Sequence, residues 1–565
     1  MSRPRTFPEA FQRTVAAHPD DVALRTPDDS VRLTWRQYGD EVRRIAGGLA
    51  ALGLRRGDTF AAMLTNRPEF NLTEVAASHL GAATYSIYPT SSPEQIHYLL
   101  THADCRIVVC ERQFVDRITA AGAPLAHLLV VEDGDLARLA PAPGFDFEAA
   151  WRAVEPDDLL CLIYTSGTTG PPKGVEHTHR GWLRLIDSVA TVWPMEAGDT
   201  AISYLPSSHS GDRFYRHYYP IVRGGQVTCL ADPAQLADVI AALHPTTFAA
   251  VPRTWEKLKA AVERQVRADE RTAAAFDAGD PAVLESIRAR LGFDRLKWAL
   301  TGTAAIPRHV YAFWQRLGLP LVVGWGMTEC GLGTAASPAE SEIGTIGRVA
   351  PGAEARIAAD GELLVRMPWL MRGYRKDPAG TAAAVDPDGW LRTGDLATVD
   401  ADGTFTIIGR KKELIVNSGG KNMSPSNIEH AITAGSPLIG PVLAFGDDRP
   451  YNVALVTLDR DAAAAYAARA GVETDPAALA RDEGVLAEIE ASVAAGNRRL
   501  SRIEQIKKLT VLPTFWDPGG DELTSTMKLK RQPIAAKYAA EIDALYADRA
   551  PERATAAIRV IRSQP

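Results

Sequence analysis

The alternation of apolar and polar residues predicts a large α/β region in the first part of the chain. Within residues 34–53, apolar side chains recur at three- and four-residue steps, as on one buried face of a helix. Thr34 and Gln37 form a capping box before this run, and Gly53 ends it. A second helix start is the run 92–95, with a serine cap and a proline at the first helical position. Apolar runs predict strands at residues 106–110, 159–164, 247–251 and 297–301. This alternation favours doubly wound sheets.

From about Gly344 the pattern changes to short alternating strands, with the turn pair Asp402-Gly403 between two of them. We expect a small antiparallel or barrel-like subdomain there. After the charged cluster 410–413 the pattern becomes mixed α+β, with an alanine-rich helical stretch at 461–500. The chain is therefore expected to form an N-terminal domain of residues 1–411 and a C-terminal domain of residues 412–565.

Composition narrows the function classes. The 565 residues carry a formal net charge of -7, which argues against a nucleic-acid partner because such proteins usually present a basic face. No apolar run of about eighteen residues occurs, so we expect a cytoplasmic protein with at most peripheral membrane contact. The five cysteines lack paired CxxC spacing, which suits neither a disulfide framework nor a zinc site. We expect most of them to be buried thiols.

The most informative stretch is residues 164–174, directly after a predicted strand. Its hydroxyls and glycine amides form a cradle of donors for phosphate oxygens, and Lys173 adds a point charge. It is not a Walker loop, which needs Gly-Lys-Ser/Thr at the start of a helix, whereas Lys173 follows two prolines. The alternative of a simple surface turn is disfavoured by eleven consecutive residues of this kind.

At this loop the sequence resembles the adenylate-forming superfamily, which includes acyl-CoA synthetases, firefly luciferase and the adenylation domains of peptide synthetases. The resemblance covers essentially the whole chain. It implies that the loop orders around the β- and γ-phosphates of ATP and holds the pyrophosphate leaving group through Thr165, Ser166, Gly167, Thr168, Thr169, Gly170 and Lys173.

Further motifs complete the nucleotide site that the resemblance implies. The run 324–329 resembles Gly-Tyr-Gly-x-Thr-Glu, in which the aromatic residue can stack on adenine and the glutamate, here Glu329 with Thr165, suits Mg²⁺. The small-residue turn at 301–305 lets adenine approach the backbone. Asp395 resembles the aspartate that accepts hydrogen bonds from both ribose hydroxyls, with Arg410 as its partner. The implied adenine-side residues are Gly302, Thr303, Ala304, Gly324, Trp325, Gly326, Met327 and Thr328.

The C-terminal motifs concern the transfer step. Residues 418–425 resemble the face of a mobile C-terminal domain that lines the pantetheine channel for coenzyme A, through Ser418, Gly419 and Gly420. The run 524–531 aligns with the catalytic-lysine motif and makes Lys528 the catalytic residue. Lys530 is its rival, because Met527 replaces the usual glycine before the lysine. The family rotates this domain about a hinge, which falls here at Lys412.

These residue types suit the activation of a carboxylic acid. Such an acid is already ionised at neutral pH, so its attack on the α-phosphorus of ATP needs no general base. Catalysis then depends on positioning and on neutralising charge. We expect Lys528 to bridge the carboxylate and the α-phosphate, Mg²⁺ to neutralise the phosphates, and the thiol of coenzyme A to displace AMP afterwards.

The acid itself is predicted from the branch of the superfamily. Residues 88–95, 251–257 and 528–531 resemble long-chain acyl-CoA synthetases, which implies a medium- or long-chain fatty acid. However, the run 204–213 carries serines where this branch has leucine and alanine, and an aspartate where it has glutamate. Polar residues weaken an alkyl-tunnel interpretation. The expected substrate-side residues are His209, Asp212, Arg213, Arg216, Gly302 and Gly326.

Several alternatives stay open at this level. Arg216 and His217 can instead lie on the solvated side of a helix. The same fold can activate a smaller polar oxyacid, such as an aryl acid, or nitrite in an ATP-dependent diazotase. A non-catalytic scaffold is disfavoured because the phosphate, magnesium and lysine positions are all intact. A membrane-binding tail at residues 553–562 is less favoured than a frayed terminus. The final acceptor and the oligomeric state are left open.

Overall fold

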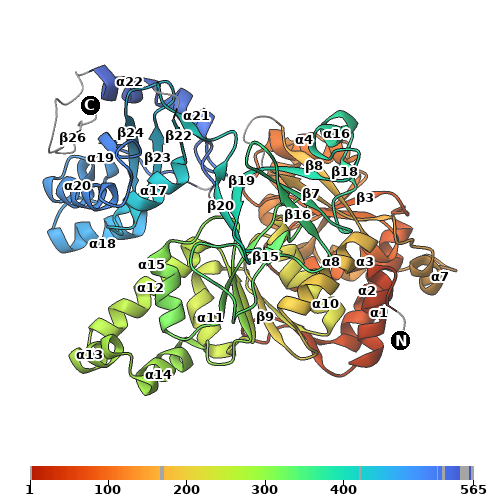
Figure 1. Cartoon of the computed structure of the whole chain (residues 1–565). Coiled ribbons are helices and arrows are strands. Elements are labelled where there is room, and N and C mark those ends of the chain that lie inside the picture. The colour runs from red at the N-terminus through yellow and green to blue at the C-terminus, as the bar shows by residue number, and fades with distance from the viewer. Residues whose placement is uncertain are drawn as a thin grey trace.

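The computed structural model describes residues 3–165, 171–418, 421–517, 519–524, 528–547 and 559–560. In Figure 1 a large N-terminal part, coloured from red to green, lies beside a smaller C-terminal part in blue. The strands β19 (Leu391–Val399) and β20 (Phe405–Arg410) run between them. Among the described residues, no helix combines the length and the apolar character needed to cross a membrane.

The largest sheet of the N-terminal part is mixed. Its centre is parallel, and its β7–β8 edge turns antiparallel, so that residues 159–165 return directly as residues 173–178. Its strands, in spatial order, are β18 (Gly373–Tyr374), β8 (Lys173–Thr178), β7 (Leu159–Thr165), β4 (Ala83–Ser86), β3 (Thr59–Met63), β5 (Ile107–Cys110) and β6 (His127–Val130).

Two further sheets complete the α/β region. The first is β2 (Arg32–Thr34), β1 (Val22–Arg25), β10 (Gln226–Cys229) and β9 (Thr200–Ser203). The second is β11 (Thr247–Ala250), β12 (Trp298–Thr301), β13 (Leu321–Trp325), β14 (Thr334–Ala335) and β15 (Arg348–Val349). All four strands predicted from apolar runs are confirmed, to within a residue at each end, as β5, β7, β11 and β12.

Helices surround the sheets of this region, and α13 and α14 pack on other helices. The helices are α1 (Phe7–Ala17), α2 (Trp35–Ala51), α3 (Pro68–His79), α4 (Pro93–Ala103), α5 (Val115–Ala120), α6 (Asp135–Arg138), α7 (Phe147–Arg152), α8 (His179–Val192), α9 (Ser210–Asp212), α10 (Tyr219–Arg223), α11 (Leu236–Leu243), α12 (Pro252–Arg267), α13 (Glu270–Ala278), α14 (Pro281–Leu291), α15 (Arg308–Arg316) and α16 (Pro378–Ala384). Short 3₁₀ turns are η1 (Arg112–Phe114), η2 (Val131–Asp133) and η4 (Pro233–Gln235), and η3 (Arg213–Tyr218) is a π-helix.

The two predicted helix starts are confirmed by their hydrogen bonds. In α2, the Thr34 hydroxyl accepts from the Gln37 N–H, and the Gln37 side chain accepts from the Thr34 N–H. Ser92 and Gln95 make the same reciprocal pair at α4. The apolar face of α2 is buried, as its periodicity predicts. All five cysteines are buried free thiols, which confirms that expectation.

The segment after Gly344 forms a small antiparallel sheet of β16 (Glu354–Ile357), β17 (Glu362–Arg366), β19 and β20. The expected turn at Asp402-Gly403 joins β19 to β20, and Gly403 has φ 81° there. In this hairpin Asp395 lies directly opposite Arg410. The antiparallel pairing is as predicted, and it brings two candidate ribose-binding residues into register.

The C-terminal part is mixed α+β, as predicted. Its strands are β21 (Ile415–Val416), β22 (Asn422–Met423), β23 (Ile439–Phe445), β24 (Asn452–Leu458), β25 (Ile506–Val511) and β26 (Arg559–Val560). Its helices are α17 (Pro425–Thr433), α18 (Arg460–Ala470), α19 (Pro476–Leu479), α20 (Glu483–Asn497), α21 (Arg531–Lys537) and α22 (Ala539–Ala547). The predicted alanine-rich helical stretch is confirmed as α18 to α20.

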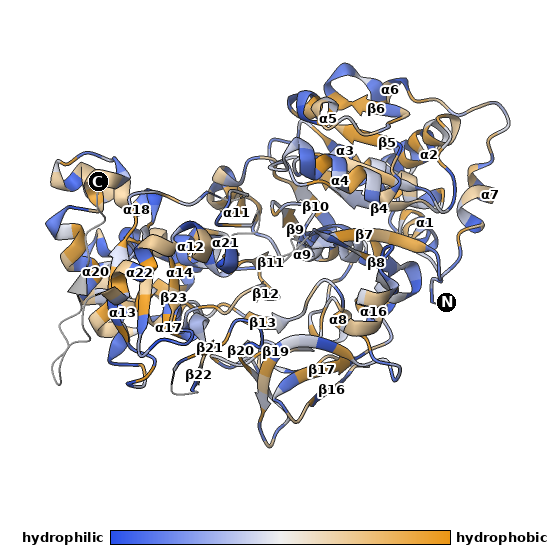
Figure 2. Cartoon of the chain, turned by 90° about the horizontal axis from the view of Figure 1, so that it is seen from above, coloured by the Kyte–Doolittle hydropathy of each residue, from blue (hydrophilic) through white to orange (hydrophobic). Residues whose placement is uncertain are grey.

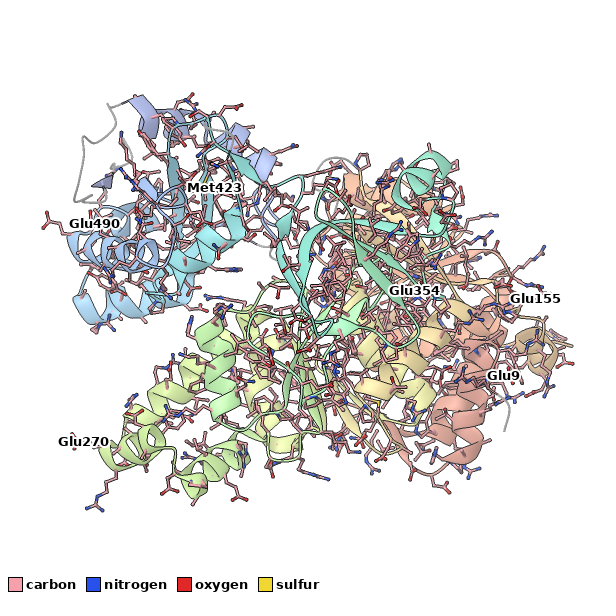
Figure 3. All side chains as sticks on the ribbon, in the orientation of Figure 1. Glu9, Glu155, Glu270, Glu354, Met423 and Glu490 are labelled. Carbon is pink, nitrogen blue, oxygen red and sulfur yellow. The ribbon has the colours of Figure 1, made fainter. Side chains whose placement is uncertain are left out.

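The hydrophobic cores separate along the chain. Three clusters draw on residues between 7 and 405, and two draw on residues between 415 and 545. Figure 2 shows apolar strands enclosed by helices whose colours alternate between polar and apolar residues. Figure 3 places Met423 within the C-terminal part, where it is buried, whereas Glu155 and Glu270 lie at the periphery. Each part thus has its own core.

Candidate active site

The two adenine-side motifs meet where β12 and β13 end. These strands are parallel neighbours, so the turns that follow them leave the same edge of the sheet. A Cβ on Gly302 would lie 3.1 Å from the Gly324 carbonyl oxygen, and one on Gly326 would lie 1.7 Å from the Gly331 oxygen. Thr303 has φ 72°, a strained conformation for a β-branched residue, and its side chain is exposed. The edge therefore presents backbone rather than side chains.

Asp395 is held between two donors at this edge. Its Oδ1 lies 2.7 Å from the Arg410 Nε, and its Oδ2 accepts from the Trp325 indole N–H at 2.8 Å. Burial raises the pKa of Asp395, while the Arg410 charge and the Trp325 hydrogen bond oppose that rise. Each carboxylate oxygen has a second lone pair, so the arrangement leaves acceptor capacity for a diol. The Trp325 ring is mostly buried and packs closely on Gly333; its predicted stacking on adenine stays a prediction.

Lys173 and Glu329 are linked through Tyr374, which sequence reasoning did not single out. The Tyr374 hydroxyl donates to Glu329 Oε1 at 2.8 Å. The Lys173 Nζ lies 4.4 Å from the centre of the same ring and 3.9 Å from Asp377 Oδ2. Thr165, which ends β7, lies opposite Lys173 in the β7–β8 register. The lysine, hydroxyl and carboxylate predicted for phosphates and magnesium therefore gather at one end of the sheet.

His177 connects this end to the adenine-side turn. Its Nε2 lies 2.8 Å from the Thr328 carbonyl oxygen, and its ring packs edge-on against Trp182. Burial lowers the pKa of His177 to about 4, so it is a neutral donor at pH 7. This histidine is a core group that positions the turn. The predicted loop residues Ser166, Gly167, Thr168, Thr169 and Gly170 lie outside the described residues, as do Gly419, Gly420 and Met527.

A short hairpin of the C-terminal part presents Lys528. The Thr524 N–H donates to the Lys528 carbonyl oxygen at 2.8 Å, and the Lys530 backbone N–H donates to the Glu522 carbonyl oxygen at 2.8 Å. Arg531 anchors the end of this hairpin. Its guanidinium contacts both Glu429 oxygens, at 2.8 and 2.7 Å, and these charges raise the pKa of Arg531. Arg531 therefore fixes Lys528 relative to α17.

The two candidate lysines meet different surroundings. Lys530 Nζ donates to the Gly520 carbonyl oxygen at 2.8 Å, within its own hairpin. Lys528 is exposed, yet the protein atoms around its ammonium and the Arg410 charge lower its pKa. The carboxylates of Asp395, Glu329 and Glu413 act in the opposite direction. Lys528 therefore lies within electrostatic reach of the ribose-side and magnesium-side carboxylates of the N-terminal part.

His209 faces the same region from the N-terminal part. Its Nδ1 accepts from the Gly211 N–H at 3.0 Å, which leaves the ring proton on Nε2. Burial and the nearby Lys528 charge lower the pKa of His209 to about 4. Asp212 follows on α9, where burial raises its pKa to about 7 against the opposing charges of Arg216 and Arg213. Asp212 Oδ1 is buried without a hydrogen-bond partner among the described residues.

Arg213 is the centre of a buried network. Its side chain is 1% exposed and contacts Glu74, while Nη2 and Nη1 donate to Thr84 and Ser86, both at 2.9 Å. The Arg213 charge holds the pKa of Glu74 below its usual value despite burial. Because its donors are occupied within the protein, Arg213 orients the segment that carries His209. Direct contact of Arg213 with substrate stays a prediction.

The alternative that Arg216 and His217 lie on a solvated helix side is wrong. Arg216 is 2% exposed, and its Nη2 donates to the Ala249 carbonyl oxygen at 3.3 Å. His217 Nδ1 lies 2.7 Å from Asn71 Oδ1, and burial lowers the pKa of His217 to about 4. No carboxylate ion-pairs with Arg216 in the part of the chain that the structure describes, and burial lowers its pKa. The physical reason is the π-helix η3, whose wide turn directs most of its side chains inward.

Two further predicted residues lie at the junction of the two parts. Lys412 is exposed in the turn that follows β20. The Ser418 N–H donates to the Arg449 carbonyl oxygen at 3.1 Å, beyond the end of β21. Their hinge and channel roles stay predictions.

Most of the chain matches two known protein-family models. Residues 11–375 match the AMP-binding enzyme family, and residues 412–550 match the AMP-binding enzyme C-terminal domain. The chain belongs to the AMP-binding enzyme family. The predicted nucleotide-binding roles of the residues at the ends of β7 and β13 and within β19 are consistent with this family.

Curated relatives share much of the chain. The putative fatty-acid–CoA ligase FadD11 of Mycobacterium tuberculosis is 47% identical over 444 residues, which cover 73% of this chain and 78% of the relative. The long-chain-fatty-acid–CoA ligase FadD15 of Mycobacterium bovis is 32% identical over 577 residues, covering 94% of this chain and 95% of the relative. These similarities place the chain in the long-chain acyl-CoA synthetase branch of the AMP-binding enzymes.

Solved structures share the fold. The anthranilate CoA ligase AuaEII, solved in complex with anthranoyl-AMP, superposes with a TM-score of 0.74 at 19% identity and covers 96% of this chain and 99% of its own. A fatty acyl CoA synthetase of Mycobacterium tuberculosis superposes with a TM-score of 0.64 at 22% identity. The match covers 95% of this chain and 99% of that one. The predicted fold class is confirmed.

Sequence reasoning missed three residues that contact the candidate site residues or their neighbours. Tyr374 links Lys173 to Glu329, Glu74 neutralises Arg213, and Glu429 holds Arg531. Only Tyr374 had a local signal, since it follows a glycine in a short apolar run before a charged turn. The other two are partners across long sequence separations, which no local pattern reveals.

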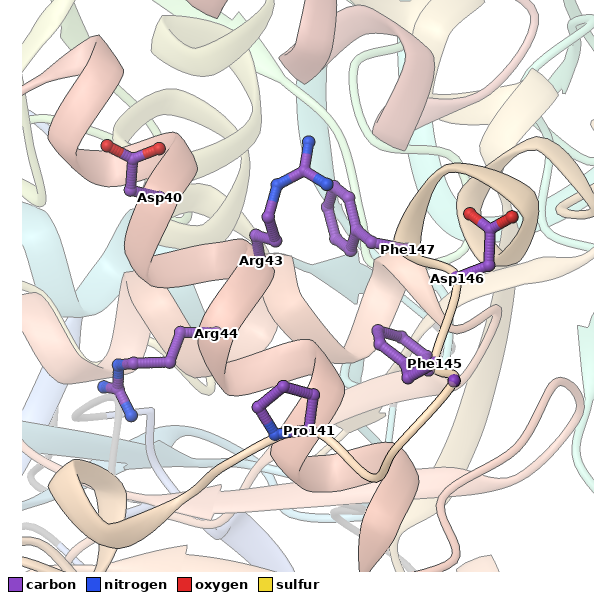
Figure 4. Close-up of a pocket in the computed structure, with 8 residues that line it drawn as sticks. Asp40, Arg43, Arg44, Pro141, Phe145, Asp146 and Phe147 are labelled. Atoms are coloured by element: carbon purple, nitrogen blue, oxygen red, sulfur yellow. The ribbon is translucent and has the colours of Figure 1, made fainter.

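A separate pocket of about 560 Å³ lies between α2 and the loop before α7 (Figure 4). Its two arginines are already engaged. Arg43 lies over the Phe147 ring and pairs with Glu148, and Arg44 pairs with Glu41 and donates to backbone carbonyls. None of the predicted site residues lines it.

Proposed function

We propose that this AMP-binding enzyme joins a carboxylic acid, of the medium- or long-chain fatty class, to coenzyme A at the expense of ATP. The observation that carries the proposal is the placement of Lys528. A lysine from the C-terminal part lies within electrostatic reach of Asp395, Glu329 and His209 of the N-terminal part. The names of FadD11 and FadD15 support the acid and the acceptor.

The first half-reaction forms an acyl-adenylate. A carboxylate oxygen attacks the α-phosphorus, the bond from that phosphorus to the bridging oxygen breaks, and pyrophosphate leaves. Lys528 bridges the incoming carboxylate and the α-phosphate oxygens, where its positive charge offsets the negative charge that gathers in the transition state. Asp395 and Arg410 hold the ribose, and Lys173 binds the departing pyrophosphate.

Magnesium fits the donor set at the end of β7. The described residues contain no group of three or more His, Cys, Asp or Glu side chains able to hold a metal. Mg²⁺ usually binds through one or two carboxylates together with substrate phosphates, so a preformed cluster is not needed. Glu329, of which one oxygen accepts from Tyr374, and Thr165 supply a carboxylate and a hydroxyl. The ion would neutralise phosphate charge there.

The second half-reaction transfers the acyl group. The thiolate of coenzyme A attacks the acyl carbon, the carbon–oxygen bond of the mixed anhydride breaks, and AMP leaves. Lys528 must withdraw to admit the thiol, so the division at 411/412 and a hinge at Lys412 belong to the proposal. The separate cores before residue 405 and after residue 415 support a rigid-body rotation. Ser418, Gly419 and Gly420 then line the pantetheine channel.

A second candidate substrate class rests on Arg216. A buried guanidinium that forms no ion pair among the described residues, and that the Asp212 charge one turn away offsets only in part, suits a smaller or more polar acid better than an alkyl chain. An aryl acid or nitrite is the corresponding substrate. Both would use the same adenylation chemistry.

Pyrophosphate release tests the proposal. The purified chain is assayed with ATP and Mg²⁺ across medium- and long-chain fatty acids, aryl acids and nitrite, with and without coenzyme A. We expect release with fatty acids and matching consumption of coenzyme A. Turnover with nitrite and an aromatic amine alone would overturn the substrate, and no release with any oxyacid would overturn adenylation itself.

A further inference from the structure

The N- and C-terminal parts touch at a second place, away from Lys528. There α12 of the N-terminal part meets the start of α18 of the C-terminal part, and the two helices lie near each other in both views (Figures 1 and 2). Arg253 on α12 forms an ion pair with Asp459, and Lys257 Nζ lies 2.8 Å from Asp461 Oδ2. Two positive charges on one part therefore face two negative charges on the other.

The positions of these four side chains on α12 and at the start of α18 favour their pairing. Arg253 and Lys257 are four residues apart, so they lie on the same face of α12. Glu256 accepts from Arg253 Nη1 at 2.9 Å and steadies the guanidinium. On the other side, Asp459 caps α18, because its Oδ1 accepts from the Ala462 N–H at 3.0 Å. Both aspartates therefore have positions set by a helix end.

The two ion pairs differ in how far their side chains are exposed to solvent. The Arg253 and Asp459 side chains are 39% and 17% exposed, whereas those of Lys257 and Asp461 are 59% and 73% exposed. Solvent screens an exposed pair strongly, so the second pair adds little by itself. The first pair is the stronger contact.

The contact between α12 and α18 is linked to Lys528 through the sheet that contains β24. Alternate residues of β24 face opposite sides: Ala454 and Val456 pack in the cluster that includes α18, whereas Val453 and Leu455 pack in the cluster that includes Leu523 of the lysine hairpin. Helix α18 and the hairpin thus lie on the two faces of the same sheet. Holding α18 against α12 holds Lys528 in its place.

We propose that Arg253–Asp459, assisted by Lys257–Asp461, is an electrostatic latch that stabilises the orientation in which Lys528 faces Asp395. This inference rests on the proposed two-step function, in which the C-terminal part rotates between half-reactions. The four residues are positioning residues. Opening the latch lowers the population that forms adenylate and leaves the orientation that accepts the thiol at least as populated.

The first test removes charge while keeping local structure. Arg253→Gln and Asp459→Asn are made singly and together; asparagine retains the helix cap. We expect ATP–pyrophosphate exchange to fall by about three- to tenfold in each single variant, with little further loss in the double. Thiolysis of a supplied acyl-adenylate by coenzyme A stays at or above the unmodified rate. Arg267→Gln is the matched control, because Arg267 lies on the same helix but pairs with Asp277 of the N-terminal part.

The second test exchanges charges at the exposed pair. Lys257→Asp or Asp461→Lys alone places like charges together and slows pyrophosphate exchange, and combining them restores it. Equal loss in both half-reactions, or no recovery in the exchanged pair, would overturn the latch.

The third test measures orientation without turnover. All five native cysteines are buried, so Gln265→Cys on α12 and Ala468→Cys on α18 can carry the only reactive spin labels. We expect the short-distance population to decrease with Arg253→Gln and with added salt. An unchanged distance distribution rejects the latch. If no acid supports pyrophosphate exchange but the distances respond, the proposed function fails while the latch stands.

Discussion

At the scale of single residues, the site depends on which of two neighbouring lysines enters it. Lys530 is tied to the Gly520 carbonyl, whereas the pKa of Lys528 responds to the charges of Asp395 and Glu329 across the two parts. Sequence resemblance favoured Lys528 but kept Lys530 as its rival, because Met527 replaces the usual glycine. The hydrogen bond of Lys530 supports Lys528 on physical grounds, and the catalytic role of Lys528 stays a prediction.

Lys528→Ala should abolish acyl-adenylate formation from acid and ATP, because the charge that bridges the carboxylate and the α-phosphate is lost. Thiolysis of supplied acyl-adenylate should largely persist. Lys530→Ala is the matched control and should keep most of the adenylation rate. Pyrophosphate exchange and thiolysis are measured separately, and near-normal exchange in the Lys528 variant would reject its assignment.

At the scale of elements, periodicity predicted regular helices well and failed at the π-helix. The α2 pattern at 3.6 residues per turn predicts its buried face correctly. In η3, however, five of the six side chains are buried, which is more than one face of a helix with a 3.6-residue period can bury: Arg213, Phe214, Arg216, His217 and Tyr218. Partners across long separations, such as Glu74 for Arg213, were equally beyond a local pattern.

The hairpin that carries Lys528 depends on the two-point contact of Arg531 with Glu429. Arg531→Lys keeps the charge but cannot form both parallel hydrogen bonds. We expect adenylation to slow by about tenfold, corresponding to about 1.4 kcal/mol, with thiolysis unchanged. Arg449→Lys, at an exposed pair with Asp543 in the same part of the chain, is the control. An unaltered adenylation rate would show that the hairpin needs no such anchor.

At the scale of the whole molecule, local sequence predicted the cores but not their mutual orientation. The change of pattern after Gly344 and the separate motifs followed from composition and resemblance. The placement of α18 against α12 involves charges that are far apart in the sequence, such as Lys257 and Asp461, which are 204 residues apart. Nothing in a local pattern identifies such partners.

Buried histidines should make the whole fold sensitive to acid. Burial lowers the pKa of four histidines to about 4 and of a fifth to about 3: His79, His177, His209, His217 and His179. Because these pKa values lie below the ordinary histidine pKa of 6.5, the unfolded state binds more protons than the folded state at pH values between about 4 and 6.5. The stabilisation is complete above pH 6.5 and is lost as pH falls toward 4.

Each such histidine contributes up to about 1.4 kcal/mol per pH unit to the slope. Urea unfolding at several pH values between 7.5 and 5 should therefore show a free energy of unfolding that is nearly constant above pH 6.5 and falls below it, and His79→Gln should reduce the slope of that fall. A free energy that stays constant down to pH 5 would contradict this account.

The transfer of a carboxylate oxygen to AMP tests the central claim most directly. When the fatty acid carries oxygen-18 in both carboxylate positions, attack on the α-phosphorus followed by thiolysis leaves one labelled oxygen on AMP. Mass spectrometry of the AMP formed with ATP, Mg²⁺ and coenzyme A should find a single oxygen-18 in its phosphate. Unlabelled AMP, or ADP formed in its place, would contradict adenylation of the acid.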